Sequence, residues 1–125
     1  VYSGWLEVGG EEDRSTLIGA VNYANCLITL EHFKEAKALM RKAMPVAQRV
    51  LGESQVTTLK MRMVYAKALY YDPGATLDDL REAVTTLEDV VRISRRVLGG
   101  SHPVTTEVEN DLQKAQAALY ARGLP

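Results

Sequence analysis

The amino-acid sequence predicts an all-α fold, an α-solenoid of about five helices stacked as antiparallel pairs. Three observations predict it. A glycine-containing turn recurs along the chain, apolar residues between the turns recur at steps of three and four, and no stretch alternates apolar and polar residues as a strand does. Because a repeated unit of this size buries its apolar stripe by stacking on its neighbours, we expect a solenoid.

The repeat is clearest in the turns. Gly10, Gly52 and Gly99 open similar stretches, and successive glycines are 42 and then 47 residues apart. The second repeat therefore carries five extra residues. We place this loop insertion near 72–76, because Asp72-Pro73-Gly74 is a strong turn signal. Gly52 and Gly99 each follow a long apolar stripe, where a residue with left-handed backbone ends a helix.

Each repeat contains two apolar stripes of helical period, and a fifth stripe follows them. The first repeat has Leu17, Ala20, Val21, Ala24, Leu27 and Ile28, then Phe33, Ala36, Met40, Ala43, Ala47 and Val50. The second has Leu59, Met63, Ala66, Leu69 and Tyr70, then Leu80, Ala83, Leu87, Val90 or Val91, Ser94 and Val97. The fifth stripe is Val104, Val108, Leu112, Ala115 and Leu119.

These stripes divide the chain into four parts. We assign helix pairs to 15–53 and 54–100 and a terminal capping helix to 101–125. For 1–14, with Trp5 and Leu6, the interpretation is an N-terminal segment or the remnant of a preceding helix, and the chain then reads as a piece of a longer array.

Three residues mark helix ends or interruptions. Pro103 suits the first turn of the last helix, where no amide hydrogen is missed. Thr76 and Asp79 have the spacing of a capping box, with Asp in place of the usual Glu. Pro45 falls inside the second stripe, so we expect that helix to bend or break near Met44.

Composition excludes several classes of function. Lys and Arg number 15 against 16 Asp and Glu, so the net charge of −1 gives no basic surface for nucleic acid or anionic membrane. One Cys cannot make an internal disulfide, one Cys and two His cannot make a four-ligand Cys/His zinc site, and no phosphate-binding loop is present. We therefore expect no metal, no cofactor and no enzyme activity. No stretch reaches the length of a membrane span and no targeting signal is found, so we expect a cytoplasmic protein.

The residues with chemical potential have plainer interpretations. We expect Cys26 to be a small, partly buried apolar residue, since no base or orienting group is proposed for it by the sequence. His102 is interpreted as a turn or capping residue and His32 as a solvated connector between two helices.

The repeated unit resembles the tetratricopeptide repeat of the kinesin light chain type. The resemblance rests on Thr16-Leu17, Asn22-Tyr23-Ala24, Leu27, Phe33, Glu35-Ala36, Leu39 and Val50-Leu51-Gly52. The stretch from Leu98 to Thr105 keeps most of the signature turn Leu-Gly-x-x-His-Pro-Asp-Thr-Leu, and the resemblance covers roughly residues 10 to 112.

This resemblance implies a non-catalytic scaffold that binds a protein or peptide in a concave groove lined by the first helix of each pair. Amides, ammonium groups and tyrosines suit such a groove, because they bond a peptide backbone, attract carboxylates and supply contact area. Carried over by alignment, the groove residues are Asn22, Asn25, Thr29, Lys60, Met63, Lys67, Tyr70, Tyr71, Asn110, Asp111 and Lys114. The alternative is a structural or oligomerising segment of a larger protein, which would self-associate through its exposed end helices. The identity of the partner is left open.

Overall fold

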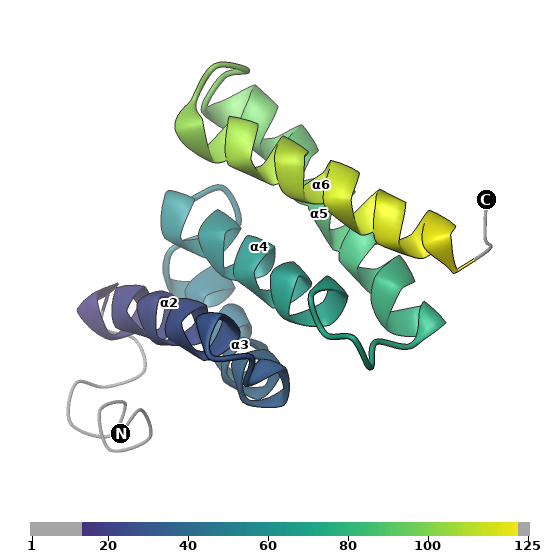
Figure 1. Ribbon diagram of the computed structural model, residues 1–125. Helices are drawn as coiled ribbons and strands as arrows, with labels where there is room; N and C mark the ends of the chain where they lie inside the picture. The colour runs from purple at the N-terminus through teal and green to yellow at the C-terminus, as the bar shows by residue number, and fades with distance from the viewer. Residues whose placement is uncertain (1–13, 123–125) are drawn as a thin grey trace.

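The computed structural model describes residues 14–122, which form five helices (Figure 1). They are α2 (Arg14–Thr29), α3 (Phe33–Val50), α4 (Val56–Tyr70), α5 (Leu77–Val97) and α6 (Pro103–Ala121). No strand occurs between residues 14 and 122, and the predicted all-α class is confirmed. The proposed remnant of a preceding helix falls almost wholly outside the described residues.

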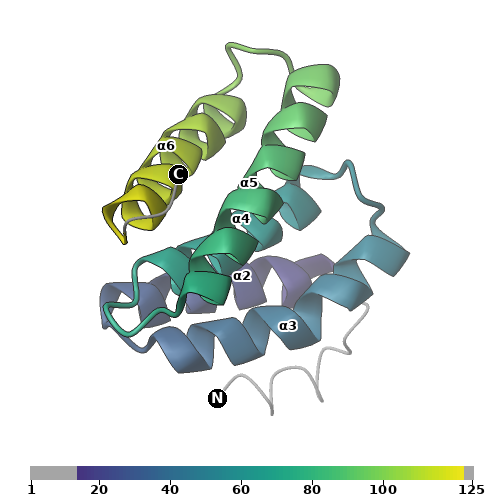
Figure 2. The same ribbon diagram turned by 90° about the vertical axis from the view of Figure 1, so that its right-hand side faces the viewer.

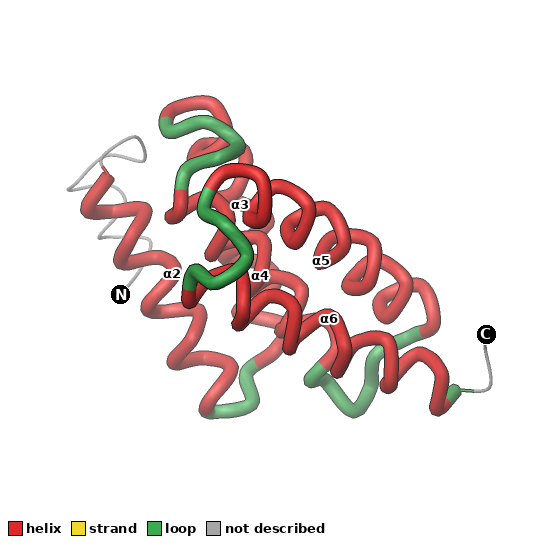
Figure 3. Tube along the Cα trace, turned by 90° about the horizontal axis from the view of Figure 1, so that it is seen from above, coloured by secondary structure: helices red, strands yellow, loops and turns green. Residues whose placement is uncertain are grey.

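The helices form two layers. The first helix of each pair, α2 and α4, lies side by side with α6 in one layer, and α3 and α5 form the other (Figures 1 and 3). Each helix also packs against the next one along the chain, as Figure 2 shows for the antiparallel α5 and α6. This is the stacking of a solenoid, as predicted. It places the exposed side of α2, α4 and α6 on one continuous surface, which we call the inner face.

The predicted stripes form most of the core. All the predicted residues of α2 and α4 are buried. Val50 and Val97, the last residue of α3 and of α5, are 40% and 45% exposed, so their assignment to the packing stripes is wrong. Each precedes a turn at the edge of its pair, where the next helix no longer covers it.

The central helix α4 is buried on more than one side. It contacts all four other helices, and its core residues therefore include several that a single stripe does not contain. These additional residues are Met61, Val64 and Ala68, each at most 1% exposed.

The predicted helix ends are confirmed. Gly52 and Gly99 both have φ of 93°, which an L side chain rarely adopts, and each amide donates to a carbonyl five residues earlier. The Thr76 hydroxyl accepts from the Asp79 amide at 3.1 Å, and the Asp79 carboxylate accepts from the Thr76 amide at 3.1 Å. Nδ1 of His102 accepts from the Val104 amide at 3.1 Å, which makes His102 the N-cap of α6.

Pro45 does not break α3. The helix runs without interruption from Phe33 to Val50, so of the expected bend or break near Met44 the break does not occur, and the bend stays a prediction. Pro45 and Arg41 both lie on the exposed side of the helix, where water can bond the Arg41 carbonyl that the missing amide would have satisfied. Exposure thus offsets one part of the cost of an interior proline, the lost hydrogen bond.

Candidate functional site

The inner face carries most of the predicted groove residues, at different depths. Those that are exposed are Asn22, Asn25, Thr29, Lys60, Tyr71, Asn110 and Lys114. Met63, Tyr70 and Asp111 are only 3%, 9% and 2% exposed, and Lys67 is partly buried. Met63 therefore packs in the core. The predicted set is thus a mixture of surface residues and residues that hold α4 against its neighbours.

A small pocket lies between the first half of α2 and the first two turns of α4. Its volume is about 160 Å³, and its lining combines apolar side chains with an amide, a hydroxyl and an ammonium group. The lining residues are Ile18, Val21, Asn22, Val56, Thr57 and Lys60. Pockets that enclose whole small molecules measure roughly 300–1,000 Å³. This one has the size for a single side chain.

A polar cluster joins α4 to α6 further along the inner face. The Tyr70 hydroxyl donates to Oδ1 of Asp111 at 2.8 Å, and both groups are buried. Nζ of Lys67 lies 3.2 Å from Oε2 of Glu107 and 3.7 Å from Oδ2 of Asp111. Asp111 Oδ2 makes no hydrogen bond within the described part of the chain. The structure thus brings together Lys67, Tyr70 and Asp111 from the predicted set.

Burial and charge pairing both shift the ionisation of this cluster. Burial raises the pKa of Asp111 above its ordinary value, although the Lys67 charge and the Tyr70 hydrogen bond act in the opposite direction. Burial, and then the Asp111 charge, raise the pKa of Tyr70. Burial alone would lower the pKa of Lys67, but the attraction of Asp111 and Glu107 raises it above the ordinary value. Lys67 therefore keeps its positive charge, and Glu107 and Asp111 balance that charge within the protein. The sequence did not predict this pairing.

Five residues of this site were missing from the predicted groove set. Ile18, Val21, Val56 and Thr57 line the pocket, and Glu107 pairs with Lys67. The alignment of the repeats could have identified Ile18, because the 42-residue period aligns it with Lys60, which was predicted to line the groove. Glu107 lies four residues before Asp111, on the same face of α6, and that spacing could have found it.

The inserted loop is folded on itself and tied to α6. Oδ1 of Asp72 accepts from the Gly74 amide at 2.8 Å, and the Ala75 carbonyl accepts from the Arg122 guanidinium. The Tyr70 and Tyr71 rings meet edge to face at 4.8 Å just before this loop. The loop therefore braces the ends of α4 and α6.

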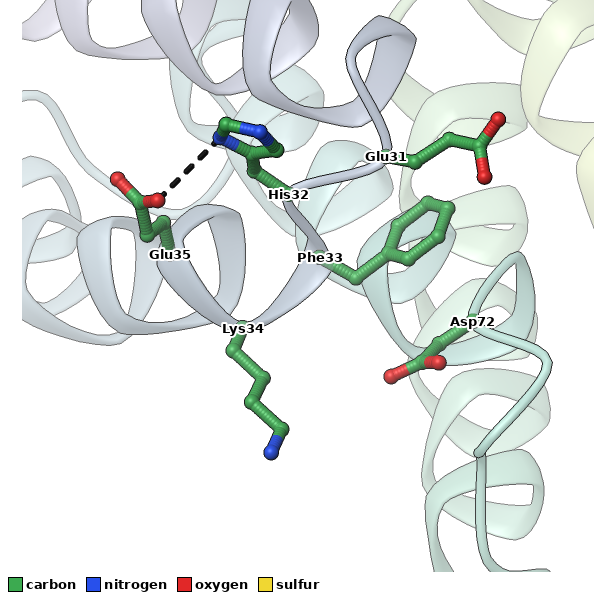
Figure 4. A pocket seen from close by; sticks show the side chains of 6 residues that line it. All are labelled: Glu31, His32, Phe33, Lys34, Glu35 and Asp72. Carbon is green, nitrogen blue, oxygen red and sulfur yellow. Dashed lines mark ion pairs between the residues drawn. The ribbon is translucent and has the colours of Figure 1, made fainter.

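A second hollow lies at the turn between α2 and α3 (Figure 4). It is lined by Glu31, His32, Phe33, Lys34, Glu35 and Asp72. Nδ1 of His32 lies 3.3 Å from Oε1 of Glu35, and their side chains are 53% and 64% exposed. Water screens groups so exposed, and this hollow gives no preorganised site. It fits the interpretation of His32 as a solvated connector.

Cys26 is exposed, so its predicted partial burial is wrong. Within residues 14–122, no group of three or more His, Cys, Asp or Glu side chains is arranged to hold a metal ion.

The stacked helix pairs and the open inner face define a helical repeat protein. The family model of the tetratricopeptide repeat matches residues 22–56 and 75–104, and the chain belongs to this family. The kinesin light chain-like subtype is consistent with that match. Repeats of this family generally mediate protein–protein interaction and are typically non-catalytic. Comparison with curated proteins and with solved structures finds no match. None of the helices between residues 14 and 122 has the length and apolar character to cross a membrane.

Proposed function

We propose that this chain is a scaffold that binds a peptide segment of a partner protein on its inner face. The observation that carries the proposal is the pocket between α2 and α4, which opens onto the inner face and has the size for one side chain. A scaffold of this kind acts by the shape and charge of its surface. It needs no catalytic group, cofactor or metal.

The chemistry of the pocket favours an apolar side chain next to a carboxylate. Ile18, Val21 and Val56 supply apolar contact, and Ile18 is 42% exposed before any partner binds. Lys60 lies at the rim and makes no ion pair within residues 14–122. Because its charge is uncompensated, it attracts a carboxylate, and the Asn22 amide can bond the peptide backbone.

The two halves of the inner face differ in charge. Around the pocket Lys60 is the available cation, whereas further along Lys67 is already paired with Glu107 and Asp111. We therefore assign carboxylate recognition to Lys60 and not to Lys67. The exposed Asn25, Tyr71, Asn110 and Lys114 extend the contact surface along the peptide.

A peptide library displayed on phage and selected against the chain tests the proposal. We expect the selected peptides to lose more than tenfold in affinity for Lys60→Glu and for Ile18→Glu. Lys34→Glu is the matched control, because Lys34 is an exposed lysine on α3, away from the inner face, and it should leave affinity unchanged. Selected peptides that bind all three variants equally well would refute the assignment.

Self-association is the second candidate function. Exposed apolar side chains at both ends of the helix stack favour it, since Leu30, in the turn after α2, is 64% exposed and Tyr120 on α6 is 73% exposed. Sedimentation equilibrium separates the two candidates. A chain that stays monomeric at all accessible concentrations would count against self-association.

A further inference from the structure

The pocket between α2 and α4 has stiff walls. Four of the residues that line it are β-branched, namely Ile18 and Val21 of α2 and Val56 and Thr57 of α4. On a helix, a β-branched side chain is largely confined to one χ1 rotamer, or to two in the case of threonine. These side chains therefore have little freedom to swing aside for a larger guest.

The helices that carry these walls are held in place by the core. α2 and α4 pack against each other, and both pack against α3. Val21 is 6% exposed and belongs to the core, and Val56 packs against the core from α4. Because a close-packed interior resists displacement, moving these two walls apart would disturb the core. The remaining lining residues, Asn22 and Lys60, are exposed and can move without widening the pocket.

The volume of the pocket limits the size of its guest. The pocket measures about 160 Å³, and an apolar cavity of about 150 Å³ accommodates one benzene molecule. The side chain of leucine and the phenyl ring of phenylalanine fit into such a space, whereas the indole of tryptophan has a second, fused ring. The part of an indole that does not fit stays in water and contributes no apolar burial.

We infer that the pocket accepts one side chain of the size of leucine or phenylalanine from the bound peptide and discriminates against tryptophan. This inference rests on the proposed function, because it concerns the same pocket and the same peptide. Since Lys60 attracts a carboxylate, the partner segment carries Leu or Phe next to Asp or Glu. The β-branched walls set the size limit, and Ile18 is the wall to alter. It is 42% exposed, so a shorter side chain there opens no cavity in the core.

Four synthetic forms of one phage-selected peptide test the size limit. They carry Leu, Phe, Trp or Ala at the peptide position where alanine costs the most affinity, and fluorescence anisotropy measures their binding. For the native chain we expect the Leu and Phe forms to bind about tenfold or more tightly than the Trp and Ala forms. Ile18→Ala removes part of one wall, so it should shift the ratio of affinities severalfold towards the Trp form.

Val50→Ala is the matched control for Ile18→Ala. Val50 is also β-branched and is 40% exposed, but it ends α3 and does not line the pocket. It should leave the ratio between the Trp and Leu forms unchanged. Circular dichroism verifies that both variants remain folded. A ratio that responds equally to both substitutions would overturn the inference, because the wall at Ile18 would then not set the size limit.

Lys60→Glu separates this inference from the proposed function. If Lys60→Glu weakens every form, and the Trp form binds the native chain as tightly as the Leu form, the peptide occupies the inner face but the size limit is overturned. If Lys60→Glu weakens no form, the proposed function fails and the inference fails with it. The inference holds when Lys60→Glu weakens the Leu form and the native chain discriminates against the Trp form.

Discussion

The Tyr70 hydroxyl of α4 donates a hydrogen bond of 2.8 Å to the buried Asp111 carboxylate of α6. Asp111 Oδ2 already lacks a hydrogen bond within the described residues, so loss of the Tyr70 donor would leave the carboxylate still less satisfied. We predict that Tyr70→Phe lowers the free energy of unfolding by about 1–3 kcal/mol. Urea denaturation measures it. Tyr120→Phe, at a ring that is 73% exposed, should change nothing, and equal effects of the two substitutions would contradict the prediction.

The raised pKa of Asp111 gives stability a pH dependence of definite sign. Between the ordinary value of 3.8 and its raised pKa in the native state, Asp111 holds more protons when folded than when unfolded. Its contribution to stability is therefore present at low pH and is lost as pH rises through the raised pKa. Asp111→Asn removes this loss, so the free energy of unfolding of the variant minus that of the native chain should rise with pH. Denaturation at pH 4 and pH 7 tests the sign, and a difference that falls with pH would show that Lys67 and not burial governs Asp111.

The capping box of α5 predicts a stability effect at an exposed site. Thr76→Ala removes the acceptor of the Asp79 amide and should cost about 1 kcal/mol. Thr85→Ala, at an exposed position inside the same helix, is the control and should have little effect. Thermal denaturation of the two variants makes the comparison.

Asp79 also makes the stability of the fold depend on pH. The hydrogen bond from the Thr76 amide lowers the pKa of Asp79 below 3.8. The resulting stability is present above pH 3.8 and is lost as pH falls through the lowered pKa. Asp79→Asn should therefore lose less stability than the native chain below pH 4. Acid denaturation curves that superimpose would contradict this.

Glu31 connects α2 to α3 with φ of 63°, the only residue other than glycine with positive φ among residues 14–122. A side chain in this region of φ costs about 1–2 kcal/mol, and replacing it by glycine would remove that cost. Glycine also loses more conformational freedom on folding, which offsets part of the gain in stability. We predict that Glu31→Gly raises the free energy of unfolding by up to about 1 kcal/mol. Glu31→Ala keeps the Cβ atom and removes the charge, so it should not reproduce the gain.

The fold was predictable because its determinants are local in the sequence. The stripes, the glycines at 52 and 99, and the Thr76–Asp79 capping box each act through neighbouring residues, and the structure confirms them. The break expected at Pro45 does not occur, because the cost of an interior proline depends in part on exposure, which the alignment does not contain. The partial burial predicted for Cys26 was wrong, because burial depends on which segments pack against that side of α2.

The site was predictable only in part, because it depends on contacts between helices. Periodicity placed Lys67 and Asp111 on α4 and α6, but not the pairing of Lys67 with Glu107 and Asp111. Periodicity had placed Met63 in the packing stripe, where it lies 3% exposed, whereas the carry-over from the family had placed it in the groove. α4 contacts four other helices and so has little free surface. Side chains on a central helix are buried by partners distant in the sequence.

Nuclear magnetic resonance tests the central claim most directly. A phage-selected peptide is titrated into the isotope-labelled chain, and the backbone amide shifts are mapped. The proposal predicts the largest shifts at Ile18, Asn22, Thr57 and Lys60, with small shifts along the exposed sides of α3 and α5. Shifts concentrated on α3 and α5, with none around the pocket, would contradict it.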